Sequence, residues 1–260
     1  MKFLMQLGTC ILLVSLALNL KAQTLITNVP VVQLIAASLV EGTQLKSHFL
    51  PPDALPMNRI PNWQSRMDPS QIPEAEAVLT IESIRSAWSL YPWVRQQHLR
   101  SVPIDIAQEL APGGARVVLQ PNLHDEYFWL DFNNLVLMLN LAAKDLKRLW
   151  PDETQIERNR AQQIRQIQET QYALETLLFE AGVTGVTLED PRLMPFAHTL
   201  GLPLLSDSSP GSIHLTTRSP GESAGWVWQI NPLLRVEEAG LQGWLTHLPE
   251  HLKQSLPPVH

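Results

Sequence analysis

The sequence predicts an α/β protein of two lobes joined by a long helical connector. Apolar strand patterns alternate with helical patterns over residues 24–119, which favours a parallel sheet with covering helices. Residues 133–181 contain almost no turn residues and have the pattern of helices. A second, shorter α/β pattern follows Gly182. The order of α/β segment, long helix and α/β segment predicts a cleft between two lobes.

The first lobe, residues 23–132, opens as a β-α-β unit. Strands are expected at 24–29 and 45–50, and the residues between them have the apolar spacing of a helix. Asp68, followed by Pro69, has the pattern of a helix N-cap. The other elements expected in this lobe are strands at 77–81, 102–106 and 117–119 and a helix at 84–94.

Two helices are expected in the connector, residues 133–181. The first ends near Trp150, where Pro151 interrupts the pattern. The second is polar, with a thin apolar seam at Ile156, Ile164, Ile167, Leu174 and Leu178. A long helix with one narrow seam fits a strut along the outside of two lobes. The alternative is a coiled-coil hairpin with Trp150 near its tip, although Arg160 and Gln171 interrupt the repeat.

The second lobe, residues 182–260, is the shorter one. Its expected elements are strands at 183–188, 204–205 and 225–230 and helices at 192–200 and 233–248. His247 and His251 have the i, i+4 spacing that places two imidazoles on one helix face. Pro249 lies between them and should spoil a regular helix. The pair is therefore expected on a frayed, solvated tail.

Residues 1–22 have the features of a secretory signal peptide. Lys2 gives a positive start, residues 3–18 are apolar, and a cut is expected before Gln23. A membrane anchor is the alternative, but the apolar stretch is short for a bilayer, which needs about 20 residues. The only cysteine, Cys10, lies in this segment, so the mature chain has no disulfide and no thiolate metal site. The formal charge of -6 gives no indication of nucleic-acid binding.

The most informative stretch is residues 127–134, Tyr-Phe-Trp-Leu-Asp-Phe-Asn-Asn, where the helical connector begins. It resembles the motif His-x-Trp-Leu-Asp-Pro-x-Asn-Ala of the periplasmic zinc- and manganese-binding proteins that feed ABC importers. The Trp, the Leu, the Asp and the first Asn are kept, and Tyr127 stands in the place of a metal-binding His. The resemblance spans nearly the whole mature chain. It implies a periplasmic, monomeric binding protein with two Rossmann-like lobes joined by a long rigid helix, and an ABC permease in the inner membrane as partner.

In the resembling family, four loops supply three His and one carboxylate to the metal. The matching positions here are Met57, Tyr127, Asp190 and Asn231. Only Asp190 is a good ligand for zinc or manganese, because a thioether suits copper(I) and neutral phenol and amide groups are weak donors. Nearby His124 and Glu189 are weak candidates to complete a metal site with Asp190. The alternative for His124 is a solvated loop residue.

Three functions follow from these residues. The first is the substrate-binding component of a metal-type ABC importer, which captures a metal ion or metal chelate as cargo and has no resident cofactor. The second is a degenerate relative that binds no metal and serves the transport system as a scaffold or accessory protein. The third is a hydrolase, because Gly221–Gly225 fits a nucleophile elbow around Ser223. The elbow lacks its strand-turn-helix context, so the protein is expected not to be an enzyme.

Overall fold

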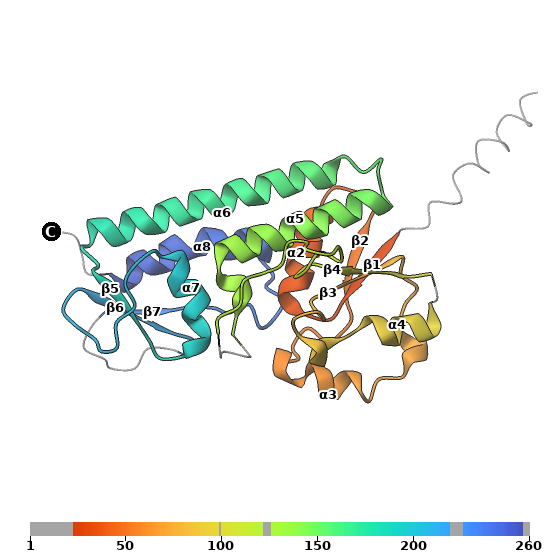
Figure 1. Ribbon diagram of the computed structural model, residues 1–260, viewed down its shortest axis with the longest axis horizontal. Coiled ribbons are helices and arrows are strands. Elements are labelled where there is room, and N and C mark those ends of the chain that lie inside the picture. Colours follow the sequence, from red (N-terminus) through yellow and green to blue (C-terminus); the bar gives the residue numbers. More distant parts are fainter. Residues whose placement is uncertain (1–22, 99, 122–125, 219–225, 257–260) are drawn as a thin grey trace, which may run out of the picture.

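The computed structural model describes residues 23–98, 100–121, 126–218 and 226–256. Two parallel sheets lie at opposite ends of the molecule, and a layer of long helices runs across both (Figure 1). The expected signal peptide, residues 1–22, lies outside the described residues. Within those residues, no helix is long and apolar enough to cross a membrane.

The first lobe contains a four-stranded parallel sheet with the order β2-β1-β3-β4. Its strands are β1 (Thr24–Thr27), β2 (Lys46–Phe49), β3 (Ala77–Thr80) and β4 (Val102–Asp105). Helix α2 (Pro30–Val40) connects β1 to β2, as the sequence predicts. Because β1 lies between β2 and β3, the strand order reverses there, which opens the carboxyl edge of the sheet to ligands or loops.

Short helices lie in the connections between β2 and β3 and between β3 and β4. They are η1 (Met57–Arg59), α3 (Ile60–Gln64), η2 (Pro69–Gln71), η3 (Ser86–Trp88) and α4 (Tyr91–Gln97). The predicted cap at Asp68 is confirmed, since its carboxylate accepts the N–H of Ser70 at 2.9 Å. The single helix expected at 84–94 is wrong. A 3₁₀ turn and a new helix replace it, and Pro92 in the first turn of α4 favours a helix start there.

The strand expected at 117–119 is also wrong. Only one isolated bridge forms nearby, between Gln108 and Arg116. The Asn134 side chain makes hydrogen bonds with both backbone polar groups of Val118. Its Oδ1 accepts the Val118 N–H and its Nδ2 donates to the Val118 C=O, each at 2.8 Å. A side-chain amide therefore takes the hydrogen bonds that a neighbouring strand would need.

Two antiparallel helices, α5 (Phe132–Leu149) and α6 (Gln155–Glu180), form the connector and turn at Trp150 (Figure 1). They do not project as a free hairpin, because α6 also packs on α2 and on α8 (Gly240–Ser255). The buried face of α6 contains Ile156, Asn159, Gln163, Ile167, Thr170, Leu174 and Leu178. Ile164 is only half-buried, so the predicted seam is wrong at that position. One apolar core runs through both sheets and these helices.

Polar side chains on the buried face of α6 hold the neighbouring helices. The Nδ2 of Asn159 donates to the carbonyls of Leu39 and Glu41 at 2.9 and 2.8 Å. These are carbonyls at the C-terminal end of α2, which the helix itself leaves unpaired. The polar positions in the seam therefore fix the first lobe to the connector.

The second lobe contains a three-stranded parallel sheet with the order β5-β6-β7. The strands are β5 (Gly185–Leu188), β6 (Ser212–Thr216) and β7 (Trp226–Gln229). Strand β6 is absent from the sequence prediction, and the expected strand at 204–205 is reduced to one bridge between Val186 and Leu204. The helix expected at 192–200 is a 3₁₀ turn, η5 (Pro191–Leu193), followed by α7 (Met194–Thr199).

Helix α8 differs most from the expectation. It begins at Gly240 rather than near residue 233 and continues through Pro249 to Ser255. Proline lacks the N–H that would bond to the carbonyl four residues earlier, which is that of Leu245. The hydroxyl of Thr170 on α6 donates to this carbonyl at 3.3 Å, so the carbonyl keeps a partner and the helix continues. His247 and His251 consequently stack on the helix surface, with ring centroids 6.0 Å apart, and the expected frayed tail is wrong.

We expect Thr170→Val to lower the free energy of unfolding by about 1–3 kcal/mol, the cost of leaving a buried carbonyl unpaired. Valine keeps the shape of the buried threonine but removes its hydroxyl. Thr176→Val is the matched control, because the Thr176 hydroxyl is exposed and bonds within its own helix, to the carbonyl of Tyr172. Urea unfolding followed by circular dichroism gives both values. Equal stabilities of the two variants would contradict this role for Thr170.

Candidate functional site

The residues that this chain keeps from the motif build the frame of the site. Asp131 caps α5, because its Oδ1 accepts the N–H groups of Asn133 and Asn134 at 2.8 and 3.4 Å. Trp129 is 1 % exposed, and its indole N–H donates to the carbonyl of Pro232 in the second lobe at 2.9 Å. These contacts fix where the connector starts and how the two lobes meet. They need no ligand.

Tyr127, in the place of the metal-binding His, lies against an arginine of the second lobe. Its backbone N–H donates to the carbonyl of Arg192 at 3.1 Å. The guanidinium of Arg192 lies over the phenol ring, 5.0 Å from its centroid, which is a cation–π distance. The Tyr127 side chain is 5 % exposed. The aromatic ring of Tyr127 therefore lies against a positive charge that the second lobe supplies.

A second arginine approaches from the first lobe. The Arg85 guanidinium lies 5.6 Å from the centroid of the Phe128 ring, and its Nη2 donates to the carbonyl of Glu126 at 2.9 Å. Arginines from both lobes thus flank the segment that carries Tyr127. The charge of Arg85 opposes the entry of a bare divalent cation, whereas the charge of Arg192 is balanced by its ion pair with Asp190.

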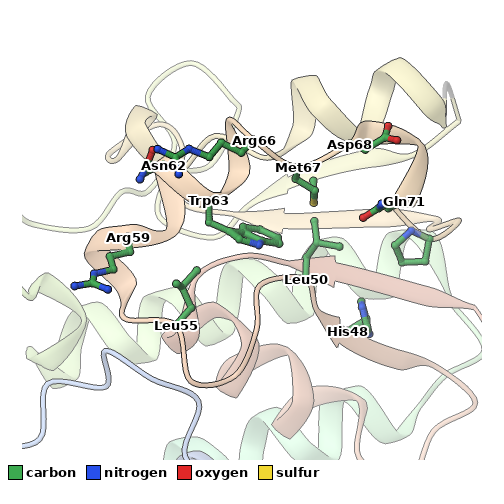
Figure 2. A pocket seen from close by; sticks show the side chains of 11 residues that line it. His48, Leu50, Leu55, Arg59, Asn62, Trp63, Arg66, Met67, Asp68 and Gln71 are labelled. Carbon is green, nitrogen blue, oxygen red and sulfur yellow. The ribbon is translucent and has the colours of Figure 1, made fainter.

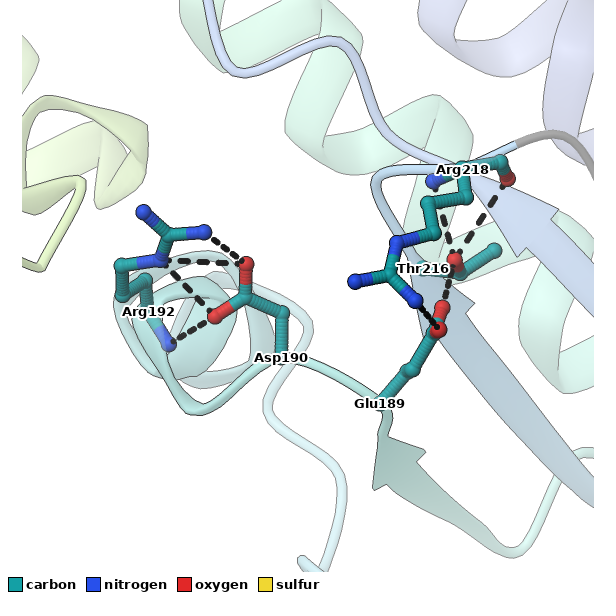
Figure 3. A network of polar contacts seen from close by, with 5 residues as sticks. All are labelled: Glu189, Asp190, Arg192, Thr216 and Arg218. Carbon is teal, nitrogen blue, oxygen red and sulfur yellow. Dashed lines mark hydrogen bonds and ion pairs between the residues drawn. The ribbon is translucent and has the colours of Figure 1, made fainter. Parts of the chain in front are cut away.

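Asp190 is clamped by Arg192 (Figure 3). Its Oδ1 accepts from the backbone N–H and the Nε of Arg192, each at 3.0 Å, and its Oδ2 accepts from Nη2 at 2.8 Å. Burial alone would raise the pKa of Asp190, but the hydrogen bonds and the charge of Arg192 outweigh it and lower that pKa. The carboxylate is therefore charged, and both of its oxygens have a partner.

Glu189 points away from Asp190 (Figure 3). The backbone at Asp190 is extended, with φ -115° and ψ 112°, so consecutive side chains project to opposite sides. Glu189 accepts hydrogen bonds from the Thr216 hydroxyl and from Nη1 of Arg218, the latter at 3.2 Å. Both residues line one hollow of about 290 Å³, and each carboxylate is paired with its own arginine.

The other two predicted positions are engaged elsewhere. Met57 is 2 % exposed and packs in the common apolar core. The Asn231 side chain bonds within its own turn, because Nδ2 donates to Glu237 at 2.9 Å and Oδ1 accepts the N–H of Leu233 at 3.0 Å. Arg192 thus links Tyr127 to Asp190, whereas Met57 and Asn231 have partners in the core and in the turn.

Metal-ligand residue types do not gather in the part of the chain that the structure describes. No group of three His, Cys, Asp or Glu side chains there is close enough to hold an ion. His124 and the elbow around Ser223 lie outside the described residues. The sequence reasoning missed Arg192 as the partner of Asp190. The available signal was an Asp-Pro-Arg sequence, in which Asp caps a short helix and Arg follows in its first turn.

A separate hollow of about 640 Å³ lies on the first lobe (Figure 2). Figure 2 shows the Trp63 ring between Leu55 on one side and Leu50 and Met67 on the other. Arg59 and Arg66 also line the hollow, and its residues of metal-ligand type are His48 and Asp68. His48 and Asp68 are two potential ligands, fewer than a zinc site uses, and Arg59 and Arg66 add two positive charges that repel a divalent ion.

Glu126, next to Tyr127, is a buried acid at 1 % exposure. Its Oε1 accepts the backbone N–H of Gln120 at 2.8 Å, and its Oε2 is buried with no hydrogen-bond partner among the described residues. Burial raises the pKa of Glu126 above 4.5, although the hydrogen bond from Gln120 and the charge of Arg85 partly oppose the shift. The folded protein therefore holds this proton to a higher pH than the unfolded chain does.

We expect Glu126→Gln to gain stability relative to the parent as the pH rises. A raised folded-state pKa stabilises the parent below the unfolded pKa, and that contribution is lost as the pH rises through the folded pKa. Glutamine does not titrate. The unfolding free energy of the variant minus that of the parent should therefore increase from pH 4 to pH 7, measured by urea unfolding. Exposed Glu238→Gln is the control, and a shift in the opposite direction would refute the assignment.

Comparison with known proteins identifies the fold. No family model matches the sequence, and no curated protein matches it. Among solved structures, the metal-dependent lipoprotein YcdH from Bacillus subtilis matches with a TM-score of 0.63 and 12 % identity, over 90 % of this chain and 99 % of that chain. The Zn(II)-bound ZnuA-like domain of AdcA from Streptococcus pneumoniae matches with a TM-score of 0.64 and 12 % identity, over 90 % and 98 %. A metal-free mutant of the periplasmic metal-binding protein from Candidatus Liberibacter asiaticus matches with a TM-score of 0.62 and 14 % identity, over 90 % and 100 %.

This chain has the fold of these metal-binding proteins. The match covers nine-tenths of the chain, so it includes both sheets and the helical backbone between them. The resemblance and the fold class predicted from residues 127–134 and the α/β pattern are therefore confirmed. At these identities the comparison establishes the fold, and the contacts of this chain's own side chains must decide its chemistry.

Proposed function

We propose that this protein is exported to the periplasm and works with an ABC permease in a metal-import system, as an accessory relative of the metal receptors. Its residues 23–132 and 182–260 form the two lobes, and residues 133–181 connect them. It takes up no bare divalent ion at the interlobe position, and it catalyses no reaction. It keeps the fold of a metal receptor and acts in the import system by binding other proteins.

The observation that carries this proposal is the clamp of Arg192 on Asp190. Asp190 is the single good metal ligand among the four matched positions, and both of its oxygens accept hydrogen bonds from Arg192. A metal that bound there would have to displace a bidentate guanidinium and would lie beside its positive charge. Bidentate arginine–carboxylate pairs are among the stronger hydrogen-bonded contacts in proteins. The scaffold function therefore fits these contacts better than ion capture.

A second candidate is the capture of a negatively charged metal chelate. The observation that favours it is Arg218, whose side chain is 83 % exposed at the rim of the hollow that contains Asp190. An exposed guanidinium can bind a carboxylate-rich chelate without giving up its contact with Glu189. Such a ligand would bring its own donors to the metal and would need none from the protein.

The test is a calorimetric titration of metal-stripped protein with zinc, with manganese and with zinc citrate. The protein carries His247→Ala and His251→Ala, so that the exposed pair on α8 adds no heat. We expect each bare ion to bind more weakly than about 100 μM. Micromolar or tighter binding that Asp190→Ala abolishes would refute the proposal. Binding of zinc citrate that Arg218→Ala abolishes would replace it with the second candidate.

A further inference from the structure

We propose that His247 and His251 form a two-ligand site for a divalent transition metal on the outer face of α8. Their imidazole rings are nearly parallel, at 10°, with centroids 6.0 Å apart. Both side chains are exposed. This site is separate from the interlobe position and does not depend on the function proposed above.

The apolar side of α8 sets the direction of the pair. Leu241, Trp244, Leu245, Leu248 and Leu252 are the buried residues of this helix. They pack against the core and fix the rotation of the helix about its axis. His247 and His251 are one turn apart outside this buried stripe and face solvent. The two imidazoles therefore lie on the same stripe of α8, and the packing of the helix keeps this stripe at the surface.

The contact with α6 keeps the spacing of the pair. Pro249 lies between the two histidines and would interrupt an isolated helix. The Thr170 hydroxyl bonds to the Leu245 carbonyl that proline leaves free, and α8 continues to Ser255. Beyond the pair, the carbonyl of His251 accepts the Ser255 hydroxyl at 2.9 Å. Tertiary packing thus preserves an i, i+4 geometry that the sequence alone argues against.

The chemistry selects the ion. Neutral imidazole nitrogen binds zinc, copper and nickel, whereas magnesium and calcium prefer oxygen. Bonds of about 2.0–2.1 Å from two imidazoles to one zinc require the rings to tilt towards each other. Exposed side chains can do so by rotating about their χ angles. Since no third His, Cys, Asp or Glu in the described ranges completes a cluster, water would fill the remaining positions.

The experiment is a titration of the metal-stripped protein with Ni²⁺ and with Zn²⁺, followed by calorimetry. We expect His247→Ala and His251→Ala each to weaken binding by at least about 10- to 100-fold, because even the loss of an outer-shell partner has an effect of that size. His48→Ala, which removes an exposed single histidine, and Asp190→Ala should each bind as the parent does.

A register variant separates the geometry of the pair from the number of histidines. His251→Ala combined with Lys253→His keeps two histidines on α8 but places them six residues apart, on different sides of the helix. Its affinity should fall as in His251→Ala, with an unchanged circular dichroism spectrum. Parent-like affinity in the single variants or in the register variant would overturn this inference. Affinity lost only in Asp190→Ala would overturn both this inference and the function proposed above.

Discussion

Replacing Trp129 with alanine is expected to lower the free energy of unfolding by about 3–5 kcal/mol, the range for removing a buried aromatic side chain. Trp129 is 1 % exposed and packs edge-on against Phe128, with ring centroids 5.2 Å apart. Its indole also donates to Pro232, 103 positions away in the chain. The substitution thus removes core packing and a contact between the first lobe and the second lobe.

Two further variants separate the contribution of the indole hydrogen bond from that of core packing. Trp129→Phe keeps an aromatic ring but loses the N–H, so we expect about 1–3 kcal/mol for the unpaired carbonyl of Pro232. Trp93→Ala removes a half-buried tryptophan outside the common core and should cost less than Trp129→Ala. Denaturant unfolding monitored by circular dichroism gives all three values. A Trp129→Ala variant within 1 kcal/mol of the parent would show that this residue does not hold the frame together.

Zinc binding is expected to appear when the four matched positions are rebuilt. The variant combines Met57→His, Tyr127→His and Asn231→Asp with Arg192→Ala, which frees the Asp190 carboxylate. The sequence predicts that these four positions face one interlobe gap, and this variant tests that prediction. If so, three new ligands and an unclamped carboxylate should raise zinc affinity by at least about 100-fold over the parent, since outer-shell changes alone alter affinity 10- to 100-fold.

The control retains Arg192 and carries the other three substitutions. It should bind zinc more weakly than the full variant, because the guanidinium still occupies Asp190 and repels the ion. Both proteins carry His247→Ala and His251→Ala, and circular dichroism confirms that they are folded, since Met57 and Tyr127 are buried. No gain in the full variant would contradict the convergence of the four positions. Equal gains in both proteins would contradict the role of Arg192.

The elements that could be predicted from the sequence are those with strong local signals. The connector is predictable as two helices because neither Gly nor Pro interrupts residues 133–149, and Pro151 marks the break. The β-α-β opening follows from apolar spacing and from Pro30, which ends the first predicted strand. Strand β6 (Ser212–Thr216) is hard to predict because it follows a polar loop and because its pairing with β5 and β7 is a long-range contact.

The incorrect predictions involve side chains that act on distant backbone. Asn134 takes the hydrogen bonds of Val118, so the strand predicted there does not form. Thr170 satisfies the carbonyl of Leu245, so a proline that should end α8 does not end it. Neither contact leaves a periodic signal in the sequence. Each depends on the packing of two segments that are far apart in the chain.

In the candidate site, too, some properties are predictable from residue types and others only from the structure. Residue types alone indicate that Met57, Tyr127 and Asn231 are poor ligands for zinc, and that inference needs no structure. The role of Arg192 appears only in three dimensions, because it acts through its bond to Asp190 and its position over Tyr127. The motif residues Trp129 and Asp131 are explained by structural contacts alone, which is why the motif remains recognisable without its metal ligand.

The most direct test of the central claim is an anomalous difference map, measured at the zinc absorption edge from crystals soaked in zinc. We expect no peak within bonding distance of Asp190, whose carboxylate remains on Arg192. A zinc peak bonded to Asp190, with the Arg192 guanidinium displaced from it, would contradict the account.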